Sequence, residues 1–399
     1  MYAYKAAKQN YTPSPIIKEL MEKFRSAVNI SVGVAMEKNL TSRNSVSKEA
    51  YHLLTDLNMP SYYYPEAINK AVALVKTYKR NIRKGRKATA PRMNRLILST
   101  YYGFKMQDGN ILIPVANRKY EKIPLNGHTQ EVTSTAGVHS FALSAYTLSL
   151  TVGREVEVLE CTATVGVDRN LRNASVGNEI HHETYDLSNV VEIKQRYRSK
   201  ISHFRRNDVR IGKKIAFKYG RRSGNRVKDI VHRTSKDIVT KAIEQKEAIV
   251  LENIKGISQI TKKGDGKGRN YRFLLKNSFP YGMLAGQITY KAQWEGLPVH
   301  ELSRKETRNT SKQCSVCGSL TRIEHDRTLK CDNCGLEIDR DINACINIAG
   351  RGRTWLKRSH EGPSAEAVKQ LKDAEQMMTS RLNEMQRDGG SIILSLNYQ

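Results

Sequence analysis

Three carboxylates stand at the ends of predicted elements, where an acid is costly to bury. Asp168 closes the apolar run Thr164–Asp168, and Glu252 directly follows a second apolar run, Ala248–Leu251. Asp341 opens a predicted helix. An acid at the edge of a buried strand needs a cation to offset its charge. If the three acids converge, they could hold two divalent metal ions about 3.5–4 Å apart, and Mg²⁺ suits such oxygen ligands.

Taken singly, each of these acids is more simply explained as a turn residue or a helix cap. The order and setting of all three together favour a catalytic site instead. One metal ion would then activate water, and the other would stabilise the leaving oxygen of a phosphodiester. The acids therefore indicate metal-dependent cleavage of a nucleic-acid backbone.

Two cysteine pairs have the spacing of a metal site. Each pair is a Cys-x-x-Cys motif followed by a glycine, which allows the tight turn that aims backbone amides at the sulfurs. Four thiolates fill a tetrahedral zinc shell and leave no open position, so we predict a structural site; four unligated core cysteines are the alternative. The predicted zinc ligands are Cys314, Cys317, Cys331 and Cys334. Cys161 and Cys345 are expected to be buried small residues.

The net charge restricts the class of partner. Lys and Arg total 67 against 39 Asp and Glu in 399 residues, a formal charge of +28. Nucleic acid is the usual polyanion for so basic a chain, and the uneven spread of the charge argues against merely unspecific binding. No apolar run approaches the roughly 18 residues that span a bilayer, and no signal peptide is visible. We therefore expect an intracellular protein without a membrane partner, cytoplasmic in a prokaryote and nuclear in a eukaryote.

Two predicted helical segments concentrate the basic residues. The first follows Pro65; its apolar stripe (Ile68, Ala71, Val72, Val75) has helical spacing, and seven cations then fall within twelve positions. Its predicted phosphate contacts, against a solvated helix end as the alternative, are Lys76, Lys79, Arg80, Arg83 and Lys84. The second segment, 194–228, holds fourteen Lys or Arg and one acid. Its predicted contacts are Arg205 and Arg206.

Aromatic residues are interleaved with the cations of the second segment, a combination that suits a nucleic-acid channel. They are Tyr197, Phe204, Phe217 and Tyr219. The competing interpretation is that the aromatic rings belong to the core and the charges to the outer face. Both interpretations can hold at once.

The remaining patterns indicate a multidomain chain of α/β and β structure. Residues 1–13 predict a strand and 14–94 mainly helices. Residues 95–160 predict an antiparallel barrel or sandwich, with the runs Leu96–Tyr102, Ile111–Val115 and Phe141–Val152 separated by the turn signals Asp108-Gly109 and Asn126-Gly127. From Thr162 the pattern becomes α/β. The segment from Trp355 to Gln399 carries six basic and six acidic residues and is expected to be an accessory helix or a disordered tail.

The chain resembles the TnpB family, the nucleases encoded by bacterial and archaeal insertion sequences, together with the compact type V CRISPR effectors and the eukaryotic Fanzor proteins. The resemblance covers about residues 161–350, whereas the first 160 residues agree only in layout. The motifs that carry it are Val165-Gly-Val-Asp168, Leu251-Glu-Asn253, Tyr290-Lys-Ala292, the cysteine block that begins at Thr310, and Asp339-Arg-Asp-Ile-Asn-Ala-Cys-Ile-Asn-Ile348.

This resemblance implies an RNase H-like (RuvC-type) nuclease domain with an inserted zinc ribbon, preceded by a β-rich wedge domain with a helical recognition insert. The implied boundaries are 1–13 and 95–160 for the wedge domain, 14–94 for the recognition domain, 161–310 and 336–354 for the nuclease domain, 311–335 for the zinc ribbon, and 355–399 for the tail.

The resemblance also implies roles for single residues. Asp168, Glu252 and Asp341 would be the catalytic triad and the ligands of Mg²⁺ or Mn²⁺. Asp341 is preferred to Asp339 because the family's ligand is the acid two positions before the asparagine, here Asn343; Asp339 would cap the helix. Arg340 would contact the scissile phosphate. A guide RNA would select the target DNA by base pairing, and the protein would act as a monomer or a homodimer.

One departure from the family pattern lies beside the first acid. Arg169-Asn170 stands where many relatives have a small or apolar residue and then glycine, and a cation there could tune the metal site or weaken it. Because all three acids are present, we predict an RNA-guided DNA endonuclease. The alternatives are a transposon-associated DNA-binding accessory protein or RNA-guided repressor without significant cleavage, and a guide-free nuclease or recombinase of the same fold.

Overall fold

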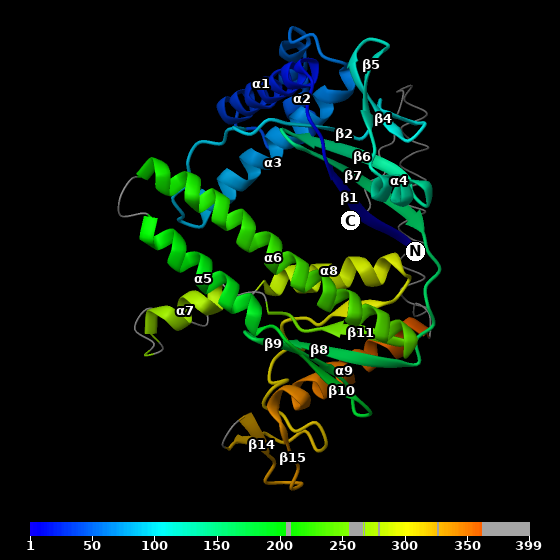
Figure 1. Ribbon diagram of the computed structural model, residues 1–399, viewed down its shortest axis with the longest axis vertical. Helices are drawn as coiled ribbons and strands as arrows, with labels where there is room; N and C mark the ends of the chain where they lie inside the picture. Colours follow the sequence, from blue (N-terminus) through cyan, green and yellow to red (C-terminus); the bar gives the residue numbers. More distant parts are fainter. Residues whose placement is uncertain (205–208, 255–265, 267, 278–279, 325–326, 361–399) are drawn as a thin grey trace. The chain divides into compact units, whose positions relative to one another are not determined.

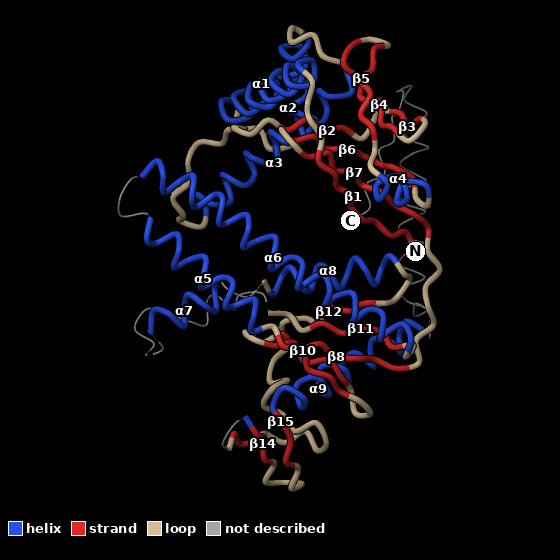
Figure 2. Tube along the Cα trace, viewed as in Figure 1, coloured by secondary structure: helices blue, strands red, loops and turns tan. Residues whose placement is uncertain are grey.

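The computed structural model describes residues 1–204, 209–254, 266, 268–277, 280–324 and 327–360 (Figure 1). The chain divides into two compact units, Met1–Glu157 and Val158–Gln399. Each unit combines helices with strands (Figure 2). Within the described ranges, no helix is long and apolar enough to cross a membrane.

Two antiparallel sheets form the β structure of the first unit. The larger has the strand order β1-β7-β6-β2, and the smaller has the order β3-β4-β5. The strands of the larger sheet are β1 (Tyr2–Asn10), β7 (Thr147–Glu155), β6 (Gly137–Ser144) and β2 (Ile97–Thr100). Those of the smaller sheet are β3 (Lys105–Gln107), β4 (Asn110–Ala116) and β5 (Lys119–Pro124).

A group of helices lies between β1 and β2 in the sequence. They are α1 (Pro15–Glu37), α2 (Arg43–Thr55), the short 3-10 helix η1 (Ser61–Tyr63) and α3 (Tyr64–Arg83). The apolar stripe predicted for the third helix is buried, since Ile68, Ala71, Val72 and Val75 are all at most 6% exposed. Helix α1 begins at Pro15 because the side chain of Ser14 accepts the amide of Ile17.

Two details of the first unit differ from the prediction. The run Phe141–Val152 is not one strand: it turns near Tyr146 into the hairpin of β6 and β7, because both halves share the same alternating pattern. Asn126-Gly127 is not a hairpin turn but the start of α4 (Gly127–Ser134), since Asn126 Oδ1 accepts the amide of Thr129 at 2.8 Å. Asp108-Gly109 does turn between β3 and β4, both residues having positive φ.

A five-stranded mixed sheet is the centre of the second unit. Its order is β10-β9-β8-β11-β12; β8 pairs parallel with β11, β11 pairs parallel with β12, and the other two pairs are antiparallel. The strands are β8 (Ala163–Arg169), β9 (Asn173–Gly177), β10 (His182–Asp186), β11 (Glu247–Leu251) and β12 (Val299–Glu301). The prediction of mixed α/β structure here is confirmed.

Helices cover the two faces of this sheet. Val165, Val167 and Ile249 share a core with helices α6 (Val209–Glu244) and α8 (Tyr281–Trp294), whereas Val250 packs with Ile348 of α9 (Arg340–His360) on the other face. Figure 1 shows α6 and α8 on one side of the sheet and α9 on the other. The remaining helices of this unit are α5 (Ser188–Phe204) and α7 (Gly268–Asn277).

Gly166 lets α9 approach the central strand closely. A Cβ added at Gly166 would lie 2.2 Å from the carbonyl oxygen of Cys345. Thr164 Oγ1 also donates a hydrogen bond to the carbonyl of Ala349 at 2.9 Å. These contacts fix α9, and with it the acid in its first turn, against the sheet.

A small three-stranded sheet precedes α9. Its strands are β13 (Arg322–Ile323), β14 (Thr328–Lys330) and β15 (Glu337–Asp339), all antiparallel. Helix α9 follows β15 directly and continues to His360, past residue 354, because Trp355 and Leu356 pack against the core. The part of the predicted tail after His360 lies outside the described residues.

Candidate functional site

The three predicted acids converge at one edge of the mixed sheet. Strands β8 and β11 are parallel with Val167 paired to Leu251, so the next residues, Asp168 and Glu252, leave the sheet at the same edge. Asp341 comes to them from the first turn of α9. The three residues are 8%, 7% and 4% exposed, respectively. Three acids far apart in sequence thus lie buried at one edge of the sheet, where the charges of Glu252 and Asp341 act on Asp168.

The start of α9 separates the roles of two neighbouring aspartates. Asp339 Oδ1 accepts the backbone amides of Asp341 at 2.7 Å and Ile342 at 3.2 Å, which is the geometry of a helix cap. The prediction that Asp339 caps the helix is confirmed. The side chain of Asp341 remains available to the site.

Burial, together with repulsion between the acids, favours the protonated form of the carboxyls of Asp168 and Glu252. Burial, followed by the negative charges of Glu252 and Asp341, raises the pKa of Asp168 to about 8. A hydrogen bond from Asn170 Nδ2 to Asp168 Oδ2, at 2.7 Å, works in the opposite direction. Burial also raises the pKa of Glu252. A divalent cation would relieve this repulsion and favour the ionised carboxylates.

Arg169, the residue that departs from the family pattern, is buried and contacts Glu252. Its backbone amide donates to Glu252 Oε1 at 2.9 Å, and its guanidinium donates to the carbonyls of Glu252 and Tyr281. Its Nε lies 3.8 Å from Glu252 Oε1. Arg169 therefore joins the ends of β8 and β11 to the start of α8 and orients Glu252.

Arg327 also belongs to the site, although no sequence pattern indicated it. Its guanidinium donates to both carboxylate oxygens of Asp341 from the segment that precedes β14. Arg340 Nη2 lies 3.5 Å from Asp341 Oδ1, and Asn173 Nδ2 lies 3.4 Å from Asp341 Oδ2. No periodic pattern or spacing links Arg327 to Asp341, because the contact depends on how the small sheet folds back.

The four predicted zinc ligands form one cluster, and their ligand atoms all lie within 4.8 Å of one another. The Sγ atoms of Cys314 and Cys334 are 3.6 Å apart, and those of Cys317 and Cys331 are 3.4 Å apart. Sulfurs in a tetrahedral shell with bonds of about 2.3 Å would be about 3.8 Å apart. The four thiols therefore fit a tetrahedral metal ion.

The turns around the cysteines also fit a metal site. Gly318 and Gly335 have φ values of +76° and +75°, which favour glycine. Their amides donate to the carbonyls of Cys314 at 3.0 Å and Cys331 at 2.9 Å. Cys161 and Cys345 lie outside the cluster and are buried, as predicted.

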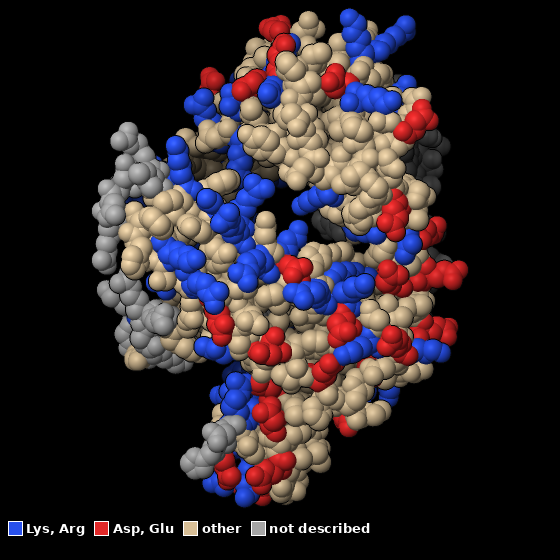
Figure 3. Space-filling view, viewed as in Figure 1, with Lys and Arg blue, Asp and Glu red and all other residues tan. Residues whose placement is uncertain are grey.

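Basic side chains gather over α5 and α6 on the face shown in Figure 3. Two of the interleaved aromatics of α5 and α6 are solvent-accessible, since Phe204 is 41% and Phe217 is 73% exposed. Tyr197 instead packs on the core and lies 5.8 Å from the ring of Tyr219. The core interpretation therefore holds for Tyr197, whereas the stacking role predicted for Phe204 and Phe217 stays a prediction. Arg205 and Arg206 lie outside the residues whose side chains are described.

The cations predicted at the end of the first basic helix are mostly exposed. Four of them, Lys76, Arg80, Arg83 and Lys84, are exposed. Lys79 is half-buried and donates to Asn39 Oδ1 at 2.5 Å.

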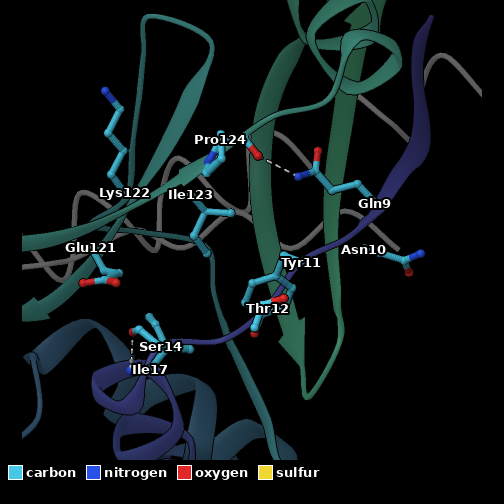
Figure 4. Close-up of a pocket in the computed structure, with 10 residues that line it drawn as sticks. All are labelled: Gln9, Asn10, Tyr11, Thr12, Ser14, Ile17, Glu121, Lys122, Ile123 and Pro124. Atoms are coloured by element: carbon cyan, nitrogen blue, oxygen red, sulfur yellow. Dashed lines mark hydrogen bonds between the residues drawn. The ribbon is translucent and has the colours of Figure 1, made fainter.

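A cavity of about 220 Å³ in the same unit lies between the β1–α1 connection and β5 (Figure 4). Its lining includes Gln9, Ser14 and Glu121 but none of the three converging acids, so it is separate from the candidate active site.

Comparison with known proteins finds similarity to TnpB-like and Cas12f1-like proteins. Residues 281–348 match the family model described as Cas12f1-like, TNB domain. A TnpB-like protein of Methanocaldococcus jannaschii is 32% identical over 166 residues. The match covers 42% of this chain and 57% of that protein, which is less than two thirds of the relative. A second TnpB-like protein of that organism is 24% identical over 379 residues, covering 89% of this chain and 85% of the relative.

Two further matches carry the name Cas12f1. The CRISPR-associated endodeoxyribonuclease Cas12f1 of an uncultured archaeon is 27% identical over 145 residues, covering 34% of this chain and 25% of that protein. The cryo-EM structure of a Cas12f1-sgRNA-target DNA complex matches with a TM-score of 0.57 and 14% identity, covering 84% of this chain and 82% of that one, so the fold is shared. The chain is therefore similar in sequence to TnpB-like proteins and shares the fold of Cas12f1.

Proposed function

We propose that this protein is an RNA-guided DNA endonuclease whose active site is formed by Asp168, Glu252 and Asp341. The convergence of these three buried acids at one sheet edge carries the proposal, because burying three carboxylates together is unfavourable unless cations bind there. The match to a protein named CRISPR-associated endodeoxyribonuclease supports the same reaction.

We assign the second unit to the RNase H-like, RuvC-type class. Support comes from the sheet, in which three antiparallel strands are followed by two strands parallel to the first, with acids after β8 and β11 and at the start of α9. The small sheet with its four cysteines would be the zinc ribbon. In the first unit, the sheets would form the wedge domain and α1–α3 its recognition insert.

The three carboxylates would hold Mg²⁺ or Mn²⁺, which supply an activated water and stabilise the leaving oxygen. Asp168 and Glu252 approach from the strand ends and Asp341 from the first turn of α9, and the charges of Glu252 and Asp341 act on Asp168. Arg169 holds Glu252 in place from behind. The amide of Asn170 holds one oxygen of Asp168 and leaves the other for a ligand.

Two arginines would meet the nucleic-acid backbone at this site. Arg327 and Arg340 both lie against Asp341, and their side chains are 47% and 31% exposed. With the charge of Asp341 offset by a bound cation, both guanidinium groups would be free to contact the scissile phosphate, for which a guanidinium is well shaped. The contact that Arg340 was expected to make is compatible with this position.

Guide RNA and target DNA would bind through the basic helices. The end of α3 and the α5–α6 pair present exposed cations, and Phe204 and Phe217 offer exposed rings on which bases can stack. Sequence choice would reside in base pairing between the RNA and the DNA.

Asp168→Ala tests the proposal. The variant should lose Mg²⁺-dependent cleavage of a guide-matched DNA by at least about 10³-fold, while its affinity for the guide RNA is unchanged. Asp229→Ala is the matched control, because its side chain is 66% exposed and lies on the surface of α6. Wild-type cleavage by Asp168→Ala would refute the assignment of the site. Tight target binding without any cleavage by the wild type would favour the repressor or accessory protein instead.

A further inference from the structure

Helix α9 contacts the cysteine cluster through its face away from the sheet. Three polar residues one turn apart, Asn343, Asn347 and Arg351, point toward the segment that leads into the first cysteine pair. The opposite face of the helix packs on the sheet through Ile348 and its neighbours. The helix that carries Asp341 is thus held from two sides.

Asn343 is fully buried and uses both ends of its amide. Its Oδ1 accepts the backbone amide of Ser315 at 2.9 Å, and its Nδ2 donates to the carbonyl of Gln313 at 2.8 Å. Asn347 Nδ2 donates to the same Gln313 carbonyl at 2.7 Å and to the carbonyl of Thr310 at 2.8 Å. Gln313 and Ser315 flank the first cysteine of the cluster.

Gln313 continues the connection into the cysteine turn. Its Oε1 accepts from Arg351 Nη2 at 2.8 Å, and its Nε2 donates to the carbonyl of Gly318 at 2.8 Å. Gly318 is the glycine that follows Cys317, and Arg351 also donates to the carbonyl of Arg308 at 2.8 Å. One glutamine therefore bridges the first cysteine pair and Arg351 of α9.

The same small domain contacts the acid site a second time. Arg327, which stands just before β14, donates to Asp341, and β14 leads to Cys331 at its end. The position of Asp341 is therefore fixed by α9, and both α9 and Arg327 are fixed by elements that the cysteines hold together.

We infer that Gln313, Asn343 and Asn347 are positioning residues that couple metal occupancy of the cysteine cluster to the geometry of the carboxylate site. This inference rests on the proposed function, in that the carboxylates bind a divalent cation. With zinc bound, the first cysteine turn is rigid and its hydrogen bonds hold α9 and Asp341 in register with Asp168. Weakening the connection frees Asp341 without removing any metal ligand.

Manganese binding to the full-length protein tests this coupling without a guide or a substrate. Free Mn²⁺ is counted by electron paramagnetic resonance, and zinc is measured in the same samples with a colorimetric dye. The wild type should show a Mn²⁺ site that Asp168→Asn removes. Gln313→Ala, still carrying its zinc, should bind Mn²⁺ about tenfold more weakly, since loss of indirect support for a ligand costs about 10–100-fold in affinity. Arg322→Ala, whose side chain is 71% exposed in the same small sheet, is the matched control and should bind like the wild type.

Each outcome decides one question. Wild-type Mn²⁺ affinity in zinc-loaded Gln313→Ala overturns the coupling. Absence of an Asp168-dependent site in the wild type overturns the proposed function instead. If Gln313→Ala loses its zinc, Asn347→Ala replaces it, because this change affects only the α9 end of the connection. The Mn²⁺ affinity of zinc-loaded Asn347→Ala is then compared with that of the wild type. Because coupling between two sites is reciprocal, Mg²⁺ at the carboxylate site should also strengthen zinc binding at the cysteines. In saturating Mg²⁺, a chelator should therefore remove less zinc at equilibrium from the wild type. Gln313→Ala should not show this protection.

Discussion

Replacing Asp168 with asparagine should stabilise the protein without added divalent cations, and more so at high pH. Burial and the charges of Glu252 and Asp341 raise the pKa of Asp168 from 3.8 to about 8 in the folded state. A carboxyl with a raised pKa stabilises the fold only while it is protonated, so its contribution is complete below pH 3.8 and is lost as the pH rises toward 8. Asparagine keeps the shape and cannot ionise.

The size of the effect follows from the pKa. Each pH unit between the unfolded and folded values costs about 1.4 kcal/mol, so the advantage of Asp168→Asn should grow by about 3 kcal/mol between pH 5.5 and pH 8. Saturating Mg²⁺ at pH 8 should reverse the order by stabilising the ionised wild type.

Denaturant unfolding of wild type and variant at the two pH values measures this difference. The buffer contains no added divalent cation. Asp229→Asn, on an exposed side chain, should show no comparable growth with pH. An Asp168→Asn advantage that is equal at pH 5.5 and pH 8 would refute the reasoning, because it would mean that the pKa of Asp168 in the folded state is not raised above its unfolded value.

Two further perturbations address the supports of the site. Cys331→Ser should lower zinc content and thermal stability together, since a structural zinc site contributes directly to folding; full zinc occupancy in the variant would exclude this ligand set. Gly166→Ala should destabilise the protein by at least about 2 kcal/mol and weaken Mn²⁺ binding, because the added Cβ would lie 2.2 Å from the Cys345 carbonyl and push α9 from the sheet. Wild-type stability in unfolding measurements would show that α9 yields without cost.

The sequence allowed much of the acid site to be predicted, for a physical reason. Asp168 and Glu252 each follow an apolar run, and parallel strands bring their ends to the same edge of a sheet. Asp341 could be chosen over Asp339 only through the family motif, since both begin the same helix. The hydrogen bonds of Asp339 to the first amides of α9 give the physical basis for that choice.

Contacts between distant segments could not be predicted from one sequence. Arg327 reaches Asp341, and Gln313 reaches Arg351, only because the small three-stranded sheet folds back on α9. Neither pair has a spacing that recurs in helices or strands. The strand β10 was also missed, because its exposed residues show no apolar alternation.

The most direct test of the central claim combines RNA sequencing with cleavage. The protein is expressed with its native flanking DNA, the copurifying RNA is sequenced, and the complex is given Mg²⁺ and a DNA that matches the variable end of that RNA. We predict one defined RNA and cleavage that disappears when the match is scrambled. Heterogeneous nucleic acid that salt removes, with no cleavage or with equal cleavage of matched and scrambled DNA, would contradict an RNA-guided endonuclease.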